Sequence, residues 1–136
     1  MVRDMAIRQV TAADAARELE GATGAAYLDV RTPEEFDAGH PAGARNVPVF
    51  VFDAATRRPR PNPEFHAIVQ RHFPPGATLL VGCQSGMRSQ RACELLADAG
   101  YTDLANVRDG FGGSEDAPGW KESGLPVESG AAGRLD

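Results

Sequence analysis

Short apolar runs recur along the chain and predict strands. Residues 78–82, TLLVG, form a continuous apolar run of the kind found in a parallel strand that is covered on both faces. Segments 25–30, 44–47 and 104–107 also carry mainly apolar or β-forming positions, with one or two polar residues in each. We therefore predict strands in these four segments.

Segments with helical spacing and capping residues separate the strands. Four helices are predicted, over residues 12–20, 33–38, 62–72 and 89–99. Thr11 with Asp14 three residues later predicts a capping box, and Thr32 followed by Pro33 predicts a second capped start. Gly100 is placed to end the last helix in a left-handed turn.

The order of these elements predicts an α/β fold. A helix lies between strands 78–82 and 104–107, and a right-handed crossover of this kind makes the two strands parallel. Residues 54–62 are rich in proline and arginine, and we expect an exposed loop there. We expect one domain over 1–128 and a flexible, glycine- and alanine-rich tail over 129–136.

Composition narrows the class of protein. The chain has 136 residues, is 42% hydrophobic and 24% charged, and carries a net charge of −5. These values are typical of a globular domain, and the acidic balance argues against nucleic acid as the main partner. Asp4 interrupts the start of the chain where a signal peptide needs an apolar core, and no window resembles a membrane span. We therefore expect a cytoplasmic protein that does not bind a membrane.

The two cysteines, Cys83 and Cys93, lie ten residues apart and belong to no C-x-x-C pair. This spacing favours neither a disulfide framework nor a zinc site, so we expect reduced thiols. Cys93 falls inside the predicted helix 89–99, where we interpret it as a packed side chain rather than a resolving thiol.

Cys83 stands where a strand ends and a helix begins, in the sequence GCQSGMRS (82–89). Ligands of open α/β sheets bind beyond the carboxyl ends of the strands, and backbone N–H groups at a helix start favour an anion. Gly86 allows successive N–H groups to turn inward, and Arg88 adds a positive charge with a planar fork of donors. The loop is therefore predicted to hold a cysteine thiolate and an anionic substrate.

Three stretches of the chain resemble a single-domain rhodanese, that is, a thiosulfate sulfurtransferase. They are residues 27–48 (YLDVRTPEEFDAGHPAGARNVP), 81–107 (VGCQSGMRSQRACELLADAGYTDLANV) and 119–127 (GWKESGLPV). The resemblance implies a three-layer sandwich, with a mostly parallel sheet of five strands and helices on both faces. The sequence departs from the family pattern in DGFGGSEDAPGW, which inserts residues before Trp120.

The resemblance also implies a reaction. Cys83 would accept a sulfur atom as a persulfide, and the substrate would be bound by the rest of the loop, namely Gln84, Ser85, Gly86, Met87, Arg88 and Ser89. Asp29 and Arg31, in the DVR motif, would support the loop from behind. Because carboxylates lie close to it in the sequence, we expect Arg31 to pair with Asp29 or Glu35, with substrate binding as the alternative. The substrate would be a small sulfur-containing anion and the acceptor a thiol, a carrier protein or, in the assay tube, cyanide. No metal or organic cofactor would be needed.

Two other functions remain open. A cysteine phosphatase or arsenate reductase also places a thiolate before a helix, but its loop has one residue more than the four between Cys83 and Arg88. A non-catalytic rhodanese-like binding module is the other, although such modules typically lack the cysteine.

The remaining candidate residues have simpler interpretations. His40 lies in a turn of glycine and proline, where we expect a structural hydrogen bond. His66 and His72 are six residues apart, a spacing that does not place them on one helix face as a metal pair. The run RRPRP (57–61) is expected to be solvated, with a docking surface for an acidic carrier protein as the alternative.

Overall fold

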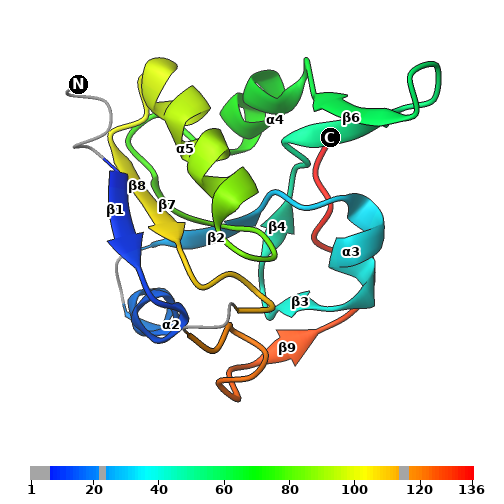
Figure 1. Ribbon diagram of the computed structural model, residues 1–136. Coiled ribbons are helices and arrows are strands. Elements are labelled where there is room, and N and C mark those ends of the chain that lie inside the picture. Colours follow the sequence, from blue (N-terminus) through cyan, green and yellow to red (C-terminus); the bar gives the residue numbers. More distant parts are fainter. Residues whose placement is uncertain (1–6, 22–23, 114–116) are drawn as a thin grey trace.

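A parallel sheet forms the centre of the protein. The computed structural model describes residues 7–21, 24–113 and 117–136. Five strands lie in the order β1-β8-β7-β2-β4, and all their pairings are parallel (Figure 1). In chain order the strands are β1 (Ile7–Val10), β2 (Ala26–Asp29), β4 (Arg45–Asn46), β7 (Thr78–Gly82) and β8 (Asp103–Val107). The predicted parallel pairing of 78–82 with 104–107 is confirmed.

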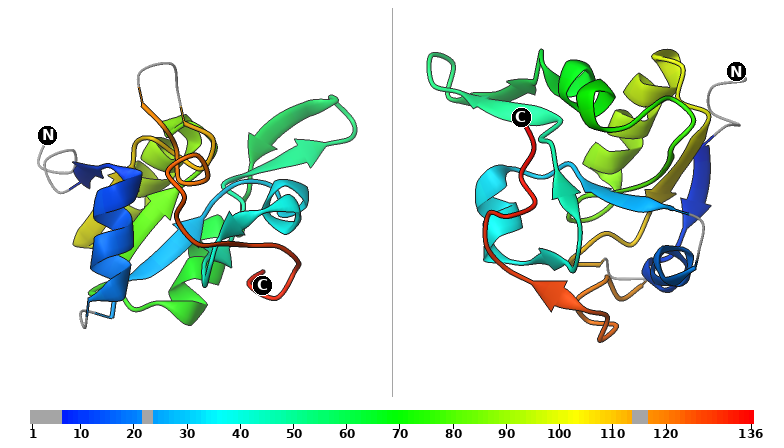
Figure 2. Two further views of the ribbon diagram at one scale, coloured as in Figure 1. Left: turned by 90° about the horizontal axis from the view of Figure 1, so that it is seen from below. Right: turned by 180° about the vertical axis from the view of Figure 1, so that it is seen from behind.

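Helices cover both faces of this sheet, as Figures 1 and 2 show. They are α2 (Ala12–Glu20), α3 (Pro33–Ala38), α4 (Phe65–His72) and α5 (Met87–Asp98). Leu79 and Val81 of β7 belong to one core cluster, with α4 and α5, while Leu80 belongs to the other, with α2 and Phe36 of α3. Neighbouring residues of a strand point to opposite faces, so an unbroken apolar run is what a doubly covered strand requires. The predicted α/β sandwich is confirmed.

Local capping signals place the helix starts. The Thr11 side chain accepts from the Asp14 backbone N–H and the Asp14 carboxylate faces the Thr11 N–H, which completes the predicted capping box of α2. Thr32 and Glu35 form the same arrangement at the start of α3, with Pro33 in the first turn. Each box satisfies backbone donors that the first turn of a helix leaves unpaired.

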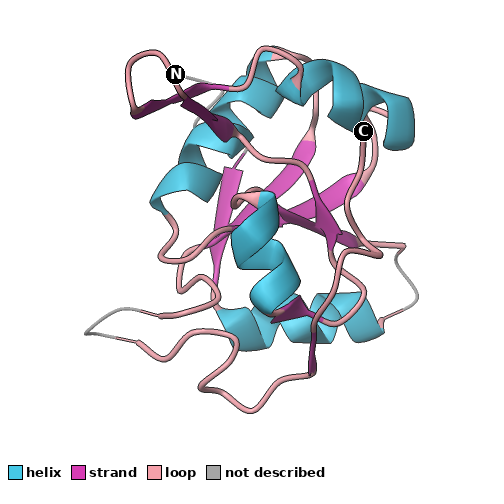
Figure 3. Cartoon of the chain, turned by 90° about the vertical axis from the view of Figure 1, so that its right-hand side faces the viewer, coloured by secondary structure: helices cyan, strands magenta, loops and turns pink. Residues whose placement is uncertain are grey.

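Some elements differ from the sequence prediction. Residues 54–62 were expected to form a loop, which is wrong, because β6 (Arg58–Pro61) pairs with β5 (Phe50–Asp53) in an antiparallel hairpin. β6 is exposed along its length while β5 is mostly half-buried, and the hairpin extends away from the sheet in Figure 3. The edge strand β1 was not predicted, nor was the small pairing of β3 (His40–Pro41) with β9 (Val127–Glu128).

The segment after β9 runs beside β4. The Asn46 N–H donates to the Gly133 carbonyl and the Leu135 N–H donates to the Asn46 carbonyl, both at 2.9 Å. The division of the chain at residue 128 stays a prediction, while the segment behind it makes these defined backbone contacts. Within the described residues, no helix has the length and apolar character needed to cross a membrane.

Candidate active site

Cys83 directly follows β7, and a ring of polar groups, two of them N–H donors, surrounds its sulfur. The backbone N–H groups of Gly86 and Ser89 donate to Cys83 Sγ at 3.1 and 3.3 Å. The Ser89 hydroxyl oxygen lies 3.3 Å from the same sulfur. Only 1% of Cys83 is exposed, so these groups, rather than water, surround the sulfur. Backbone N–H groups that converge on one atom in this way are suited to holding an anion.

Gly86 gives the loop its shape. Its φ is +98°, in the left-handed region that side chains rarely adopt. A Cβ at this position would lie 2.5 Å from the Arg108 carbonyl oxygen, which is backbone and cannot rotate aside. The inward turn of the Gly86 N–H therefore depends on glycine.

A second segment, residues 108–113, supports the cysteine loop from outside. The Phe111 N–H donates to the Cys83 carbonyl at 2.8 Å, and the Gly112 N–H donates to the Gln84 carbonyl at 3.0 Å. Gly110 has a φ of +68° and packs against the backbone of Gln84. A Cβ added to Gly110 would lie 2.3 Å from the Gln84 backbone carbonyl oxygen. From the sequence, residues 109–120 were noted only as an insertion before Trp120, and this support was not predicted. Residues 114–116 of the noted insertion lie outside the described residues.

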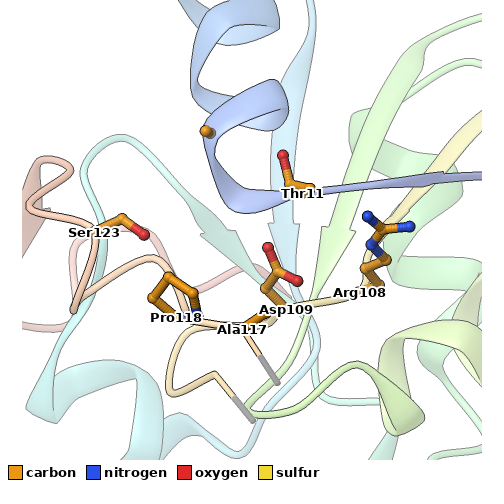
Figure 4. Close-up of a pocket in the computed structure, with 7 residues that line it drawn as sticks. Thr11, Arg108, Asp109, Ala117, Pro118 and Ser123 are labelled. Atoms are coloured by element: carbon orange, nitrogen blue, oxygen red, sulfur yellow. The ribbon is translucent and has the colours of Figure 1, made fainter. Parts of the chain in front are cut away.

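The supporting segment is itself tied to α2. Asp109 accepts a hydrogen bond from the Ala12 N–H at 3.0 Å, and Figure 4 shows its carboxylate directed toward the start of α2 beside Thr11. The cavity drawn there has a volume of about 570 Å³. Its lining residues include none from the cysteine loop, so we do not place the reaction in it.

Two ion pairs lie beside the loop. Arg31 donates to both carboxylate oxygens of Asp29, and both residues are buried, which confirms one of its two expected partners. Glu35 pairs instead with Arg88, through two bonds of 2.7 and 3.0 Å. The Arg88 guanidinium, a hydrogen-bond donor to Glu35, lowers the pKa of that carboxyl to about 2.

These two ion pairs contain Arg31 and Arg88, which the sequence predicted to belong to the site. Arg88 was expected to be available to an oxyanion, but its fork already binds Glu35. Arg31 Nη1 also donates to the Gln84 side chain at 3.4 Å, which links the buried pair to the loop. A cavity of about 540 Å³ borders this contact and contains Lys121, a cation that the sequence analysis did not single out.

The other candidate residues lie outside the ring of polar groups around Cys83. Cys93 is fully buried in α5, where desolvation raises the pKa of its thiol to about 12. His40 is stacked on Phe36, with ring centroids 3.6 Å apart, and its Nδ1 lies 2.7 Å from the Phe36 carbonyl oxygen. His66 and His72 are exposed on α4.

Comparison with known proteins decides the family. The family model of the rhodanese-like domain matches residues 11–116. This chain belongs to the rhodanese-like domain family. The rhodanese-like chain is 41% identical over 103 residues to thiosulfate sulfurtransferase 16, chloroplastic, of Arabidopsis thaliana, covering 76% of this chain and 79% of that protein.

Other relatives support the same assignment. Rhodanese-like domain-containing protein 15, chloroplastic, of Arabidopsis thaliana is 40% identical over 113 residues, which cover 83% of this chain but only 57% of that protein. A crystal structure of Rv0390 from M. tuberculosis has a TM-score of 0.73 and 29% identity, covering 90% of this chain and 97% of that one. The rhodanese fold expected from the sequence is confirmed.

These names also correct one expectation. Both Arabidopsis relatives are chloroplastic proteins, whereas the sequence analysis predicted a cytoplasmic one. The cytoplasmic prediction is therefore wrong. It rested on the missing apolar core at the N-terminus, and that observation addresses secretion through a signal peptide rather than the choice among compartments.

Proposed function

We propose that this rhodanese-like protein is a sulfurtransferase that moves a sulfane sulfur through a persulfide on Cys83. The observation that carries the proposal is the pair of backbone N–H groups, from Gly86 and Ser89, that donate to Cys83 Sγ. These donors stabilise negative charge on a buried sulfur without any metal. The names of the relatives support the same reaction at the level of the family.

The reaction takes place in two displacements. The Cys83 thiolate attacks the outer sulfur of thiosulfate, a new S–S bond forms, and the bond from that sulfur to the sulfonate breaks. Its electron pair leaves with sulfite, and the charge of the persulfide lies on its outer sulfur. A nucleophile, such as cyanide or a thiol, then attacks the outer sulfur and returns Cys83 to the thiolate.

The surrounding residues have supporting tasks. Arg88 interacts electrostatically with Cys83 from the first turn of α5, and its bidentate pairing with Glu35 fixes the direction of the guanidinium. Asp29 and Arg31 hold the Gln84 side chain from behind the loop. Lys121, which lines the cavity beside Gln84, adds a positive charge where an anionic donor approaches.

Intact mass spectrometry after treatment with thiosulfate tests the proposal. We expect one added sulfur atom that dithiothreitol removes, together with thiocyanate formation when cyanide is supplied. Cys83→Ser is expected to abolish both, while the matched variant Cys93→Ser keeps them because Cys93 lies outside the loop. Thiocyanate formation by Cys83→Ser would refute the proposal.

A parallel assay separates sulfur transfer from phosphatase chemistry. The loop from Cys83 to Arg88 has four intervening residues, a tighter ring than the phosphatase loop described above. We expect no turnover of an aryl phosphate by the wild-type protein. Phosphatase turnover without sulfur transfer would favour the phosphatase interpretation, and the absence of both activities would favour a binding module.

A further inference from the structure

A series of polar side chains leads away from Cys83 toward the surface. The Ser89 hydroxyl, 3.3 Å from Cys83 Sγ, donates to Asn106 Oδ1 at 2.5 Å. Asn106 Nδ2 donates to Gln9 Oε1 at 3.0 Å and to the Gly86 carbonyl at 3.3 Å. Asn106 lies on β8, and the proposed function gives it no task.

The orientation of the Asn106 amide follows from its partners. A carbonyl oxygen such as that of Gly86 can only accept, so the atom of Asn106 that faces it is the amide nitrogen. The amide oxygen therefore faces Ser89, and that oxygen also can only accept. Ser89 has a single hydroxyl proton, and this geometry directs the proton to Asn106.

The direction of the Ser89 hydroxyl proton determines whether a proton or a lone pair faces the Cys83 sulfur. The Ser89 oxygen presents only lone pairs to the sulfur, and a protonated thiol can donate to them. A thiolate would face the same lone pairs without a proton between them. Ser89 can turn its proton to a thiolate only by leaving Asn106 Oδ1 unpaired, and Asn106 is only 3% exposed.

We propose that Asn106 is a positioning residue that acts through Ser89 to favour the protonated thiol of Cys83 and so restrains the cysteine between turnovers. In the persulfide the inner sulfur is uncharged, because the negative charge lies on the outer sulfur. The Ser89 lone pairs are therefore compatible with the persulfide, and the pair of Ser89 and Asn106 selects against the free thiolate alone.

Other groups around Cys83 act independently of this pair. The N–H groups of Gly86 and Ser89 favour the thiolate. Tyr27 of β2 and Arg88 and Cys93 of α5 interact electrostatically with Cys83 in the described structure. None of these is altered in the test below. The inference rests on the proposed function only in taking Cys83 as the reacting thiol.

Alkylation by iodoacetamide at about pH 7.5 tests the inference in a double-mutant cycle. We expect Asn106→Leu to react about tenfold faster than wild type, because the released Ser89 proton then donates to the thiolate. Ser89→Ala should accelerate alkylation less, because it removes the lone pairs but adds no donor. In the Ser89→Ala background, Asn106→Leu should produce no further change.

The cycle distinguishes this role from a merely structural one. Asn106→Leu also removes the bond to Gly86, and a loosened loop would expose Cys83 in both backgrounds equally. Equal acceleration with and without the Ser89 hydroxyl would therefore overturn the inference. Unchanged or slower alkylation of Asn106→Leu would overturn it as well.

A spectroscopic measurement tests the same point where a variant fails to fold. The Raman S–H stretching band of Cys83, assigned by its loss in Cys83→Ser, should lie at the lower frequency of a hydrogen-bonded thiol and rise in Ser89→Ala. A missing Cys83 band in the resting protein, or one unaffected by Ser89→Ala, would overturn the inference. Thiocyanate formation, assayed separately, reports only on the proposed function, so the two failures are distinguishable.

Discussion

Cys83 and Cys93 lie ten residues apart on either side of the start of α5, and both are buried. Cys83 faces two backbone N–H groups and a hydroxyl oxygen. Cys93 packs in a cluster with Ala92 and Leu96, and burial raises the pKa of its thiol. Burial alone therefore keeps a cysteine inert, and donors aimed at the sulfur create the conditions for anion chemistry.

The largest expected difference between the two cysteines is in their reactivity. With a pKa of about 12, Cys93 is a thiolate in roughly one molecule in 10⁴–10⁵ near neutral pH. We expect iodoacetamide to modify Cys83 at least about a thousandfold faster than Cys93 in the folded protein, and both at similar rates in denaturant. Peptide mapping by mass spectrometry measures both rates. Comparable alkylation of the two in the native state would remove the distinction drawn here.

The glycines at the two ends of α5 sharpen the comparison. Gly86 and Gly100 have φ values of +98° and +100°, but only Gly86 has backbone where its Cβ would be placed. Gly86→Ala should cost about 2–4 kcal/mol of unfolding free energy and abolish thiocyanate formation. Gly100→Ala should cost only about 1–2 kcal/mol and leave activity unchanged.

Denaturant unfolding and a thiocyanate assay on both variants check this expectation. Equal loss of activity in the two would show that the helix as a whole, rather than the amides around Cys83, supports the reaction.

The features that were predicted correctly from the sequence are those that depend on short-range patterns. The unbroken apolar run of 78–82, the Thr11 and Thr32 caps and the glycine loop after Cys83 all depend on neighbours within a few residues. β1 was missed because its two central residues are exposed at the sheet edge and resemble loop. β6 was missed because its alternating prolines argue against a strand anywhere except at an edge.

Contacts between distant segments are what the sequence could not predict. Arg88 and Glu35 are 53 positions apart, and only Arg31, four residues before Glu35, was considered from the sequence as a partner for Glu35. The bond of Ser89 to Asn106 and the support of the loop by Phe111 depend in the same way on the order of strands in the sheet. The resemblance to rhodaneses drew attention to residues 109–120 only as an insertion before Trp120.

A smaller effect is expected at Arg88, which lies between the two cysteines. Arg88→Lys keeps the charge but cannot reproduce the planar fork that binds both oxygens of Glu35, so sulfur transfer should fall by about tenfold. Arg91→Lys, on the exposed part of the same helix, is the matched control and should retain full activity. Steady-state thiocyanate kinetics measure both, and wild-type rates in Arg88→Lys would show that charge alone is sufficient.

The smallest effect concerns the pH dependence that Glu35 gives to stability. Pairing with Arg88 lowers the pKa of Glu35 from 4.5 to about 2, so the folded state favours the carboxylate. The resulting stabilisation is fully present above about pH 5 and is lost as the pH falls from 4.5 toward 2. Because the pair is partly exposed, we expect this stabilisation to amount to less than about 1 kcal/mol.

The variant Glu35→Gln tests this expectation, because it can keep the cap of α3 while removing the charge. The difference in unfolding free energy between wild type and Glu35→Gln should shrink as the pH falls from 6 to 3. Urea unfolding at these two pH values measures it, and a difference that is the same at both would show that the ion pair contributes nothing to stability.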